Sequence, residues 1–97
     1  MLTGKQRRYL RSLGQRLAAT LQVGREGVTA AVVEQADTQL AAHELIKIRV
    51  SEHAPVSRHE TADTLAARTR ADVVQVLGRT ALLYRRRPAD PAIVLPA

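Results

Sequence analysis

The segment Leu21–Thr29 constrains the fold more than any other part of the chain. Its apolar residues up to Val23 can form a short strand, the next residues read Gly-Arg-Glu-Gly, and a helix-compatible sequence begins near Thr29. Gly24 and Gly27 let the backbone turn tightly and approach a ligand without a Cβ in the way. Because the first N–H groups of the following helix face this corner, with the positive end of the helix dipole behind them, the corner suits a phosphate. A GxxG sequence is also typical of a plain strand-to-helix turn, so the motif alone leaves both interpretations open.

Periodic patterns on both sides of this corner predict the other elements. Thr3 can cap a first helix whose leucines share one face, and Gly14 is the expected stop near its end. The pair Gly78-Arg79 separates two β-rich runs and predicts a two-residue hairpin turn with Gly at its first central position. The predicted order is helix 3–15, strand 18–23, helix 29–42, strand 44–50, helix 57–70 and strands 73–77 and 80–84.

The predicted strand 44–50 alternates between two kinds of side chain. Ile46, Ile48 and Val50 point to one face. Lys47 and Arg49 point to the other, which predicts a sheet that helices cover on one side only. Strands separated by helices are expected to pair in parallel through crossovers, and the final hairpin adds an antiparallel pair. The fold class is therefore predicted to be α/β (α+β), a single domain of order α-β-α-β-α-β-β with helices packed on a four-stranded mixed sheet.

Charge and composition restrict the function. The 97 residues carry 15 Lys and Arg against 9 Asp and Glu, a net charge of +6, and the sequence pI is near 11.1. A bias towards Arg codons can explain Arg over Lys but not the excess of cations over anions, so we expect a polyanionic partner such as a nucleic acid. The chain has no Cys, no apolar run of membrane-spanning length and no N-terminal signal sequence. These absences predict a cytoplasmic protein without membrane contact.

Basic residues gather where acids are absent. No Asp or Glu occurs before Glu26, and the predicted first helix carries Lys5, Arg7, Arg8 and Arg11 on the side away from its leucines. This face can be an ordinary solvated surface, but the absence of acids favours a binding surface.

The end of the chain carries a second basic patch, Arg85–Arg87. It can contact RNA, or it can be a charged strand end that keeps the edge of the sheet from pairing. A Pro-spaced tail follows, expected to be extended and to pack through Ile93, Val94 and Leu95. The predicted division is a domain over residues 1–87 and a tail over residues 88–97.

No enzyme is predicted. His43, His53 and His59 have neither Cys partners nor compact ligand spacing, so we expect no metal site, no cofactor and no catalytic residue. Tyr9 and Tyr84 are the only aromatic residues, too few for a sheet that stacks bases, and Tyr84 is expected in the core with its hydroxyl at the rim. The remaining way to recognise RNA is through its backbone and shape, with loop amides and Arg on phosphates.

Several segments together resemble the CRM (chloroplast RNA splicing and ribosome maturation) domain in its bacterial, single-domain YhbY-type form. They cover nearly the whole chain and are Leu2–Gln6, Val23–Thr29, His43–Ile48, Val74–Thr80, Leu83–Arg85 and Ile93–Pro96. The His-Glu-Leu-Ile-Lys sequence and the final hairpin, at their distances from the GxxG sequence, make the resemblance specific.

The resemblance implies an RNA-binding fold similar to the C-terminal domain of translation initiation factor 3, and an association with large-subunit ribosome precursors. Carried over to this chain, it places RNA at Gly24, Arg25, Glu26 and Gly27. Nearby basic side chains extend the predicted site: Lys5, Arg8, Arg11, Lys47 and Arg49. Glu26 departs from the expected pattern, because a carboxylate repels phosphate, and it can instead cap the second helix.

The expected function is that of a non-catalytic, monomeric protein that binds structured ribosomal RNA during assembly of the large subunit. The alternative is a protein–protein module that docks on a ribosomal or other partner protein, with its charge incidental. Salt separates the two, since phosphate binding weakens steeply as salt rises and apolar docking does not.

Overall fold

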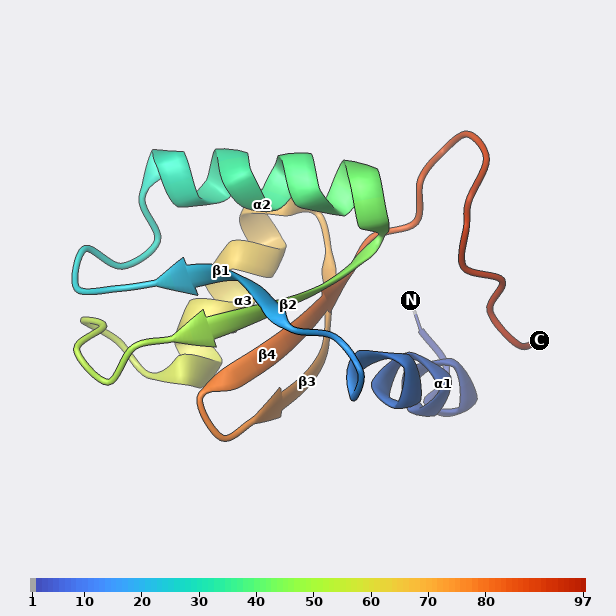
Figure 1. Cartoon of the computed structure of the whole chain (residues 1–97), viewed down its shortest axis with the longest axis horizontal. Coiled ribbons are helices and arrows are strands. Elements are labelled where there is room, and N and C mark those ends of the chain that lie inside the picture. The colour runs from blue at the N-terminus through green and yellow to red at the C-terminus, as the bar shows by residue number, and fades with distance from the viewer. Residues whose placement is uncertain (1) are drawn as a thin grey trace.

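The computed structural model describes residues 2–97, and Figure 1 shows its elements in chain order. They are α1 (Gly4–Gly14), β1 (Ala19–Val23), α2 (Ala30–His43), β2 (Leu45–Val50), α3 (Arg58–Thr69), β3 (Asp72–Leu77) and β4 (Thr80–Tyr84), in the predicted order. Each helix begins after a Ser or Thr whose hydroxyl oxygen accepts a backbone N–H three residues further on. The expected cap Thr3 also forms the reciprocal bond with Gln6, which fixes the start of α1. Within residues 2–97, no helix has both the length and the hydrophobicity that crossing a membrane requires.

The four strands form one mixed sheet in the order β1-β2-β4-β3. β1 and β2 run parallel, with Val23 opposite Val50, because α2 carries the chain back along the sheet between them. β4 lies between β2 and β3 and is antiparallel to both. Leu77 pairs with Thr80 across a turn in which Gly78 has φ +57°, as predicted for the hairpin. The predicted α+β fold with a four-stranded mixed sheet is therefore confirmed.

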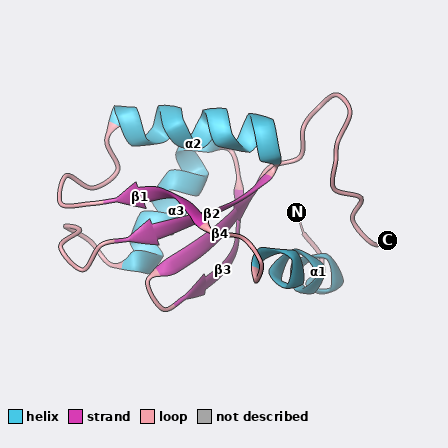
Figure 2. Ribbon diagram, in the orientation of Figure 1, coloured by secondary structure: helices cyan, strands magenta, loops and turns pink. Residues whose placement is uncertain are grey.

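α2 and α3 cover one face of the sheet (Figure 2), and the main hydrophobic core lies between these layers. Ile46, Ile48 and Val50 of β2 point into it, as predicted. Leu40 of α2 and Leu65 of α3 are fully buried there, and truncation of either to Ala should cost about 2–5 kcal/mol. The buried members are Leu21, Val23, Ala36, Leu40, Ile46, Ile48, Val50, Ala62, Leu65, Ala66, Ala81 and Leu83.

The opposite face of the sheet holds a second, smaller core beneath α1. Its buried members are Leu10, Leu45, Val74, Leu82 and Tyr84. The expectation that helices cover one side only is wrong, because β4 is apolar on both faces and its alternate residues need cover on each. Gly14 allows the close approach of α1, since a Cβ there would overlap the side chain of Leu82. This packing role comes in addition to the helix stop that was expected of Gly14.

Arg7 does not lie on the outer side of α1, where the helical pattern placed it. Its Nη1 donates a hydrogen bond to the carbonyl oxygen of Val73 in β3. This cation therefore ties α1 to the sheet, whereas Lys5 and Arg8 on the same helix are exposed.

Glu44, between α2 and β2, is fully buried and holds the segment that follows β4. Its Oε2 accepts the backbone N–H of Arg87 at 2.9 Å, and its Oε1 accepts those of Ala92 at 2.7 Å and Ile93 at 2.8 Å. Burial alone would raise the pKa of Glu44, but these N–H donors and the charge of Arg87 outweigh it and lower the pKa below its ordinary value of 4.5. The carboxylate is therefore a charged anchor for the tail.

The tail itself (residues 88–97) returns from the end of α2 towards α1 (Figure 1). Ile93 and Leu95 pack against the second core, as expected, but Val94 is 80% exposed and does not pack. The hydroxyl of Tyr84 is not at the rim either, because it is buried and has no hydrogen-bond partner among residues 2–97. Burial and the negative charge of Glu44 raise the pKa of Tyr84 above its ordinary value of 10.0.

Candidate nucleic-acid interface

The GxxG loop (Gly24–Gly27) connects β1 to α2 through a tight turn. The N–H of Gly27 donates to the carbonyl oxygen of Gly24 at 3.0 Å. Gly27 has φ +73°, and a Cβ on it would lie 2.9 Å from Pro55 Cγ, so the fold itself requires glycine at this position. Gly24 has an ordinary φ, and apart from its two chain neighbours no residue of the described part of the chain has an atom within 4 Å of a Cβ built on it. The bare backbone at Gly24 therefore faces open space.

α2 begins at the same corner. Thr29 Oγ1 accepts the N–H of Val32 at 3.2 Å, so Thr29 is the N-cap. The N–H groups of Ala30 and Ala31 meet no acceptor within residues 2–97. Glu26 is exposed and does not cap the helix, which corrects that suggestion. The free N–H groups and the positive end of the helix dipole favour an anion at this corner.

Beyond α1, part of the sheet remains uncovered, and we call it the open strip. It consists of the polar side chains of Gln22, Lys47, Arg49, Gln75 and Thr80, which share the face of the sheet that α1 occupies. Arg49 lies opposite Gln22 in β1 and Thr80 in β4. Lys47 and Gln75 border the end of α1 and line one small cleft with Gly14. The predicted basic face of β2 therefore exists and opens to solvent.

The structure does not gather all of the predicted site residues in one place. β1 runs from the end of α1 to the GxxG loop, so Lys5, Arg8 and Arg11 lie at the other end of the sheet from Arg25 (Figure 1). Lys47 and Arg49, in the open strip, lie between these two groups along the sheet.

The six predicted cations have no polar partner within residues 2–97. None of them forms an ion pair or a side-chain hydrogen bond within the described part of the chain; they are Lys5, Arg8, Arg11, Arg25, Lys47 and Arg49. The acidic side chains Glu34, Asp37, Glu60 and Asp63 all belong to α2 and α3, on the opposite face. On the α1 face the cations of α1 and β2 outnumber the acids, one of which is Asp72, the residue paired with Tyr84.

Arg79 is a residue of this region that the sequence reasoning missed. Its carbonyl oxygen accepts the N–H of Val50 at 2.7 Å, so the hairpin turn lies beside the end of β2 and at the same end of the sheet as the GxxG loop. Arg79 Nη2 lies 3.5 Å from Glu52 Oε2, and both side chains are more than half exposed. The antiparallel hairpin was the available signal, because it returns the chain to that end of the sheet.

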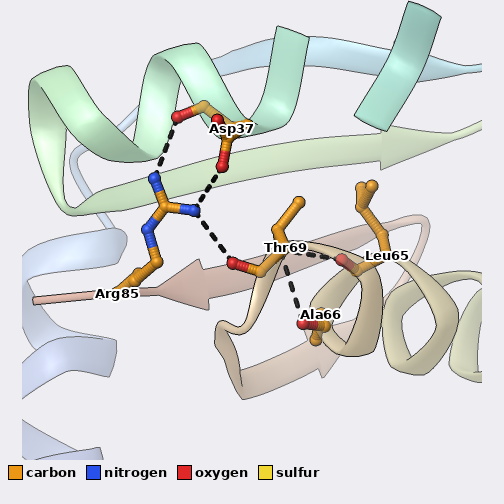
Figure 3. Close-up of polar contacts among 5 residues, drawn as sticks. All are labelled: Asp37, Leu65, Ala66, Thr69 and Arg85. Carbon is orange, nitrogen blue, oxygen red and sulfur yellow. Dashed lines mark hydrogen bonds and ion pairs between the residues drawn. The ribbon is translucent and has the colours of Figure 1, made fainter. Parts of the chain in front are cut away.

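The run Arg85–Arg87 divides into separate roles. Figure 3 shows Arg85, whose Nη1 donates to Asp37 Oδ1 at 2.6 Å and to the carbonyl oxygen of Thr69 at 2.9 Å. Arg87 donates to the carbonyl oxygens of Ala42 and Asp90, and Arg86 is exposed. The suggestion that these residues protect a sheet edge is wrong, because β4 is an interior strand.

Comparison with known proteins identifies relatives of similar sequence along nearly the whole chain. The sequence model of the CRS1 / YhbY (CRM) domain matches residues 2–85. The chain is 38% identical over 96 residues to "Probable RNA-binding protein YqeI" of Bacillus subtilis, covering 99% of this chain and 100% of that one. It is 36% identical to "Probable RNA-binding protein PA4753" of Pseudomonas aeruginosa, covering 90% and 84% of the two chains.

A solved structure agrees with these matches. The solution structure of SAV1595 from Staphylococcus aureus, a hypothetical protein named as a candidate RNA-binding protein, superposes with a TM-score of 0.84 at 40% identity. The match covers 99% of this chain and 100% of that one. On the extent of the family match and of these relatives, the chain belongs to the CRS1 / YhbY (CRM) domain family.

Proposed function

We propose that this chain is a non-catalytic RNA-binding protein that recognises structured RNA through the GxxG loop and the open strip. The carrying observation is the combination of an unhindered backbone at Gly24 with cations that have no partner within residues 2–97. Two relatives named as RNA-binding proteins support the choice of RNA over other polyanions.

Recognition would depend on phosphates and shape. The N–H groups at the start of α2 and the guanidinium of Arg25 suit one phosphate group, and Lys47 and Arg49 suit others further along a backbone. The side chains of the open strip are amides, a hydroxyl and cations, and Leu77 beside them is 65% exposed, so this face has no aromatic platform for a base. Structured RNA fits this arrangement, and we propose ribosomal RNA in precursors of the large subunit as the target.

The test is equilibrium binding to a labelled hairpin of large-subunit ribosomal RNA over a series of salt concentrations. The log–log slope should be steep, at about −0.7 to −0.9 per phosphate contact. Gly24→Asp should abolish most binding while the circular dichroism spectrum stays unchanged, because the position is open and its φ is ordinary. Gly27 is unsuitable for this purpose, since any side chain there strains the fold.

Matched controls separate a local effect from a change in net charge. Arg25→Gln and Arg70→Gln each remove one cation, but Arg70 is an exposed residue at the end of α3, away from the proposed site. Only Arg25→Gln should lower the salt slope. Binding that ignores both salt and Gly24→Asp would point instead to the docking of a partner protein. Preference for ribosomal hairpins over transfer RNA of equal length tests the proposed target.

A further inference from the structure

Glu44 stands where α2, β4 and the tail meet. Its own backbone N–H donates to the carbonyl oxygen of Leu40 at 2.9 Å, and its carbonyl oxygen accepts the N–H of Arg85 at 2.8 Å. Its φ of +66° and ψ of −43° lie outside the regions that non-glycine residues normally adopt. Such a conformation persists only where the surroundings over-determine it, and strained residues of this kind concentrate at functional positions.

α1 is held by two neighbours, the sheet and the tail. α2 and α3 pack against each other as well as against the sheet, whereas α1 lies on the other face and contacts β2 and β3. The tail supplies its second support. Gln6 Nε2 donates to the carbonyl oxygen of Pro96 at 3.1 Å, and Ile93 and Leu95 pack in the same core as Leu10 of α1.

The part of the tail that Glu44 binds is also the part that packs beneath α1. The carboxylate of Glu44 holds the backbone N–H groups of Ala92 and Ile93, and the side chain of Ile93 is one of those that pack beneath α1. A shift of the tail at Glu44 therefore moves the surface on which α1 rests. Glu44 itself cannot touch a ligand, because it is 0% exposed.

We infer that Glu44 is a positioning residue for RNA binding: by anchoring the tail, it holds α1 where Lys5, Arg8 and Arg11 meet the same RNA as the open strip. This inference rests on the proposed function and extends it to the α1 end of the molecule. In this arrangement the tail keeps the cations of α1 in line with the cations of the open strip and the GxxG loop, so that together they form one extended RNA-binding surface.

Three variants of the full chain test it. Glu44→Gln replaces one acceptor oxygen by an NH2 group, which cannot accept the N–H groups of the tail. Ile93→Ser with Leu95→Ser leaves Glu44 intact and removes the apolar contacts of the tail. Val94→Ser is the matched control, because Val94 lies in the same tail and is 80% exposed. Circular dichroism and hydrogen exchange of the sheet amides verify that each variant is folded.

The readout is the salt slope of binding to the ribosomal hairpin. Loss of the α1 cations from the interface lowers the magnitude of the slope by up to about 2–3, at ~0.7–0.9 for each phosphate. Glu44→Gln and the double serine variant should both show this loss, and Val94→Ser should match the wild type. Adding Lys5→Gln, Arg8→Gln and Arg11→Gln to the double serine variant should cause no further loss, because both changes act through the same helix.

A wild-type slope in the folded double serine variant overturns the inference and leaves the proposed function standing. Losses that add fully when the tail and α1 changes are combined also overturn it, because they indicate independent effects. Absence of salt-dependent binding by the wild type overturns the proposed function, and the inference with it. If Glu44→Gln fails to fold, the double serine variant decides the question, since it leaves the buried carboxylate and its donors unchanged.

Discussion

Alanine at each of the two glycines of the GxxG loop should have opposite effects on stability. At Gly27 an alanine must adopt φ +73°, which costs an L-residue about 1–2 kcal/mol. Its Cβ would also lie 2.9 Å from Pro55 Cγ, and overpacking of this kind costs about 1–3 kcal/mol. At Gly24 neither penalty applies, and the smaller freedom of the unfolded chain should stabilise the protein by up to about 1 kcal/mol. The two variants should therefore differ by about 2–6 kcal/mol.

Urea unfolding followed by far-ultraviolet circular dichroism measures this difference, because the chain has no Trp. Equal m-values in the two variants would show that midpoints can be compared directly. In thermal unfolding, a loss of 1 kcal/mol lowers the Tm of a domain of this size by about 4–8 °C. Gly27→Ala should thus lower the Tm by about 10 °C or more, with Gly24→Ala at or slightly above the wild type. Equal destabilisation by both alanines would refute the reasoning, because it would show that the fold needs both glycines.

Three further predictions concern the polar side chains Arg85, Glu44 and Tyr84. Arg85→Lys should cost about 1.5–3 kcal/mol in urea unfolding, because a shorter side chain with one nitrogen cannot reach the three acceptors that Nη1 and Nη2 bond, Asp37 Oδ1 and the carbonyl oxygens of Thr69 and Asp37. Asp37→Asn should cost less than about 1 kcal/mol, since that carboxylate is 61% exposed. The pKa of Glu44 is lowered in the native state, so this carboxylate stabilises the fold above the pKa that it has in the unfolded chain, and the stabilisation is lost as the pH falls through the native pKa. In the Glu44→Gln variant, the free energy of unfolding should therefore change less with pH in acid than it does in the wild type. Tyr84→Phe should leave stability unchanged or raise it by about 1 kcal/mol, because the buried hydroxyl has no partner, and a clear loss in thermal unfolding would contradict this.

Local sequence patterns predicted the helices and strands, but they did not predict that α1 packs on the second face of the sheet. Apolar periodicity and caps gave the helices, and the Gly78-Arg79 turn gave the hairpin. β4 contributes buried apolar residues to both cores, and cover of one of them by α1 depends on the close contact of Gly14 with Leu82. A glycine near a helix end is normally interpreted as a stop, so this contact had no separate signal.

The polar network around Glu44 could not have been predicted from spacing. Its carboxylate binds N–H groups more than 40 residues away in the chain, and no periodic pattern links such positions. Arg85 is different, because it continues the alternation of Ala81 and Leu83, which face α2 and α3. Extending that alternation would have placed Arg85 inward. The two glycines of the GxxG loop are equivalent in sequence, and only the φ of Gly27 and its contact with Pro55 distinguish them.

The central position of β4 sets an order of events during synthesis. This strand follows the other three in the chain, yet it fills the gap between β2 and β3. At about 5–20 residues per second, the stretch from Val50 to Thr80 takes roughly 2–6 s to make. Throughout that time β2 presents an open hydrogen-bonding edge, the state in which strands of different chains can pair, and β3 does the same once Leu77 has been made. The sheet therefore closes in one late step, and in a nascent chain that stops before Thr80 the two halves of the sheet are joined by the packing of α2 against α3 and not by hydrogen bonds between strands.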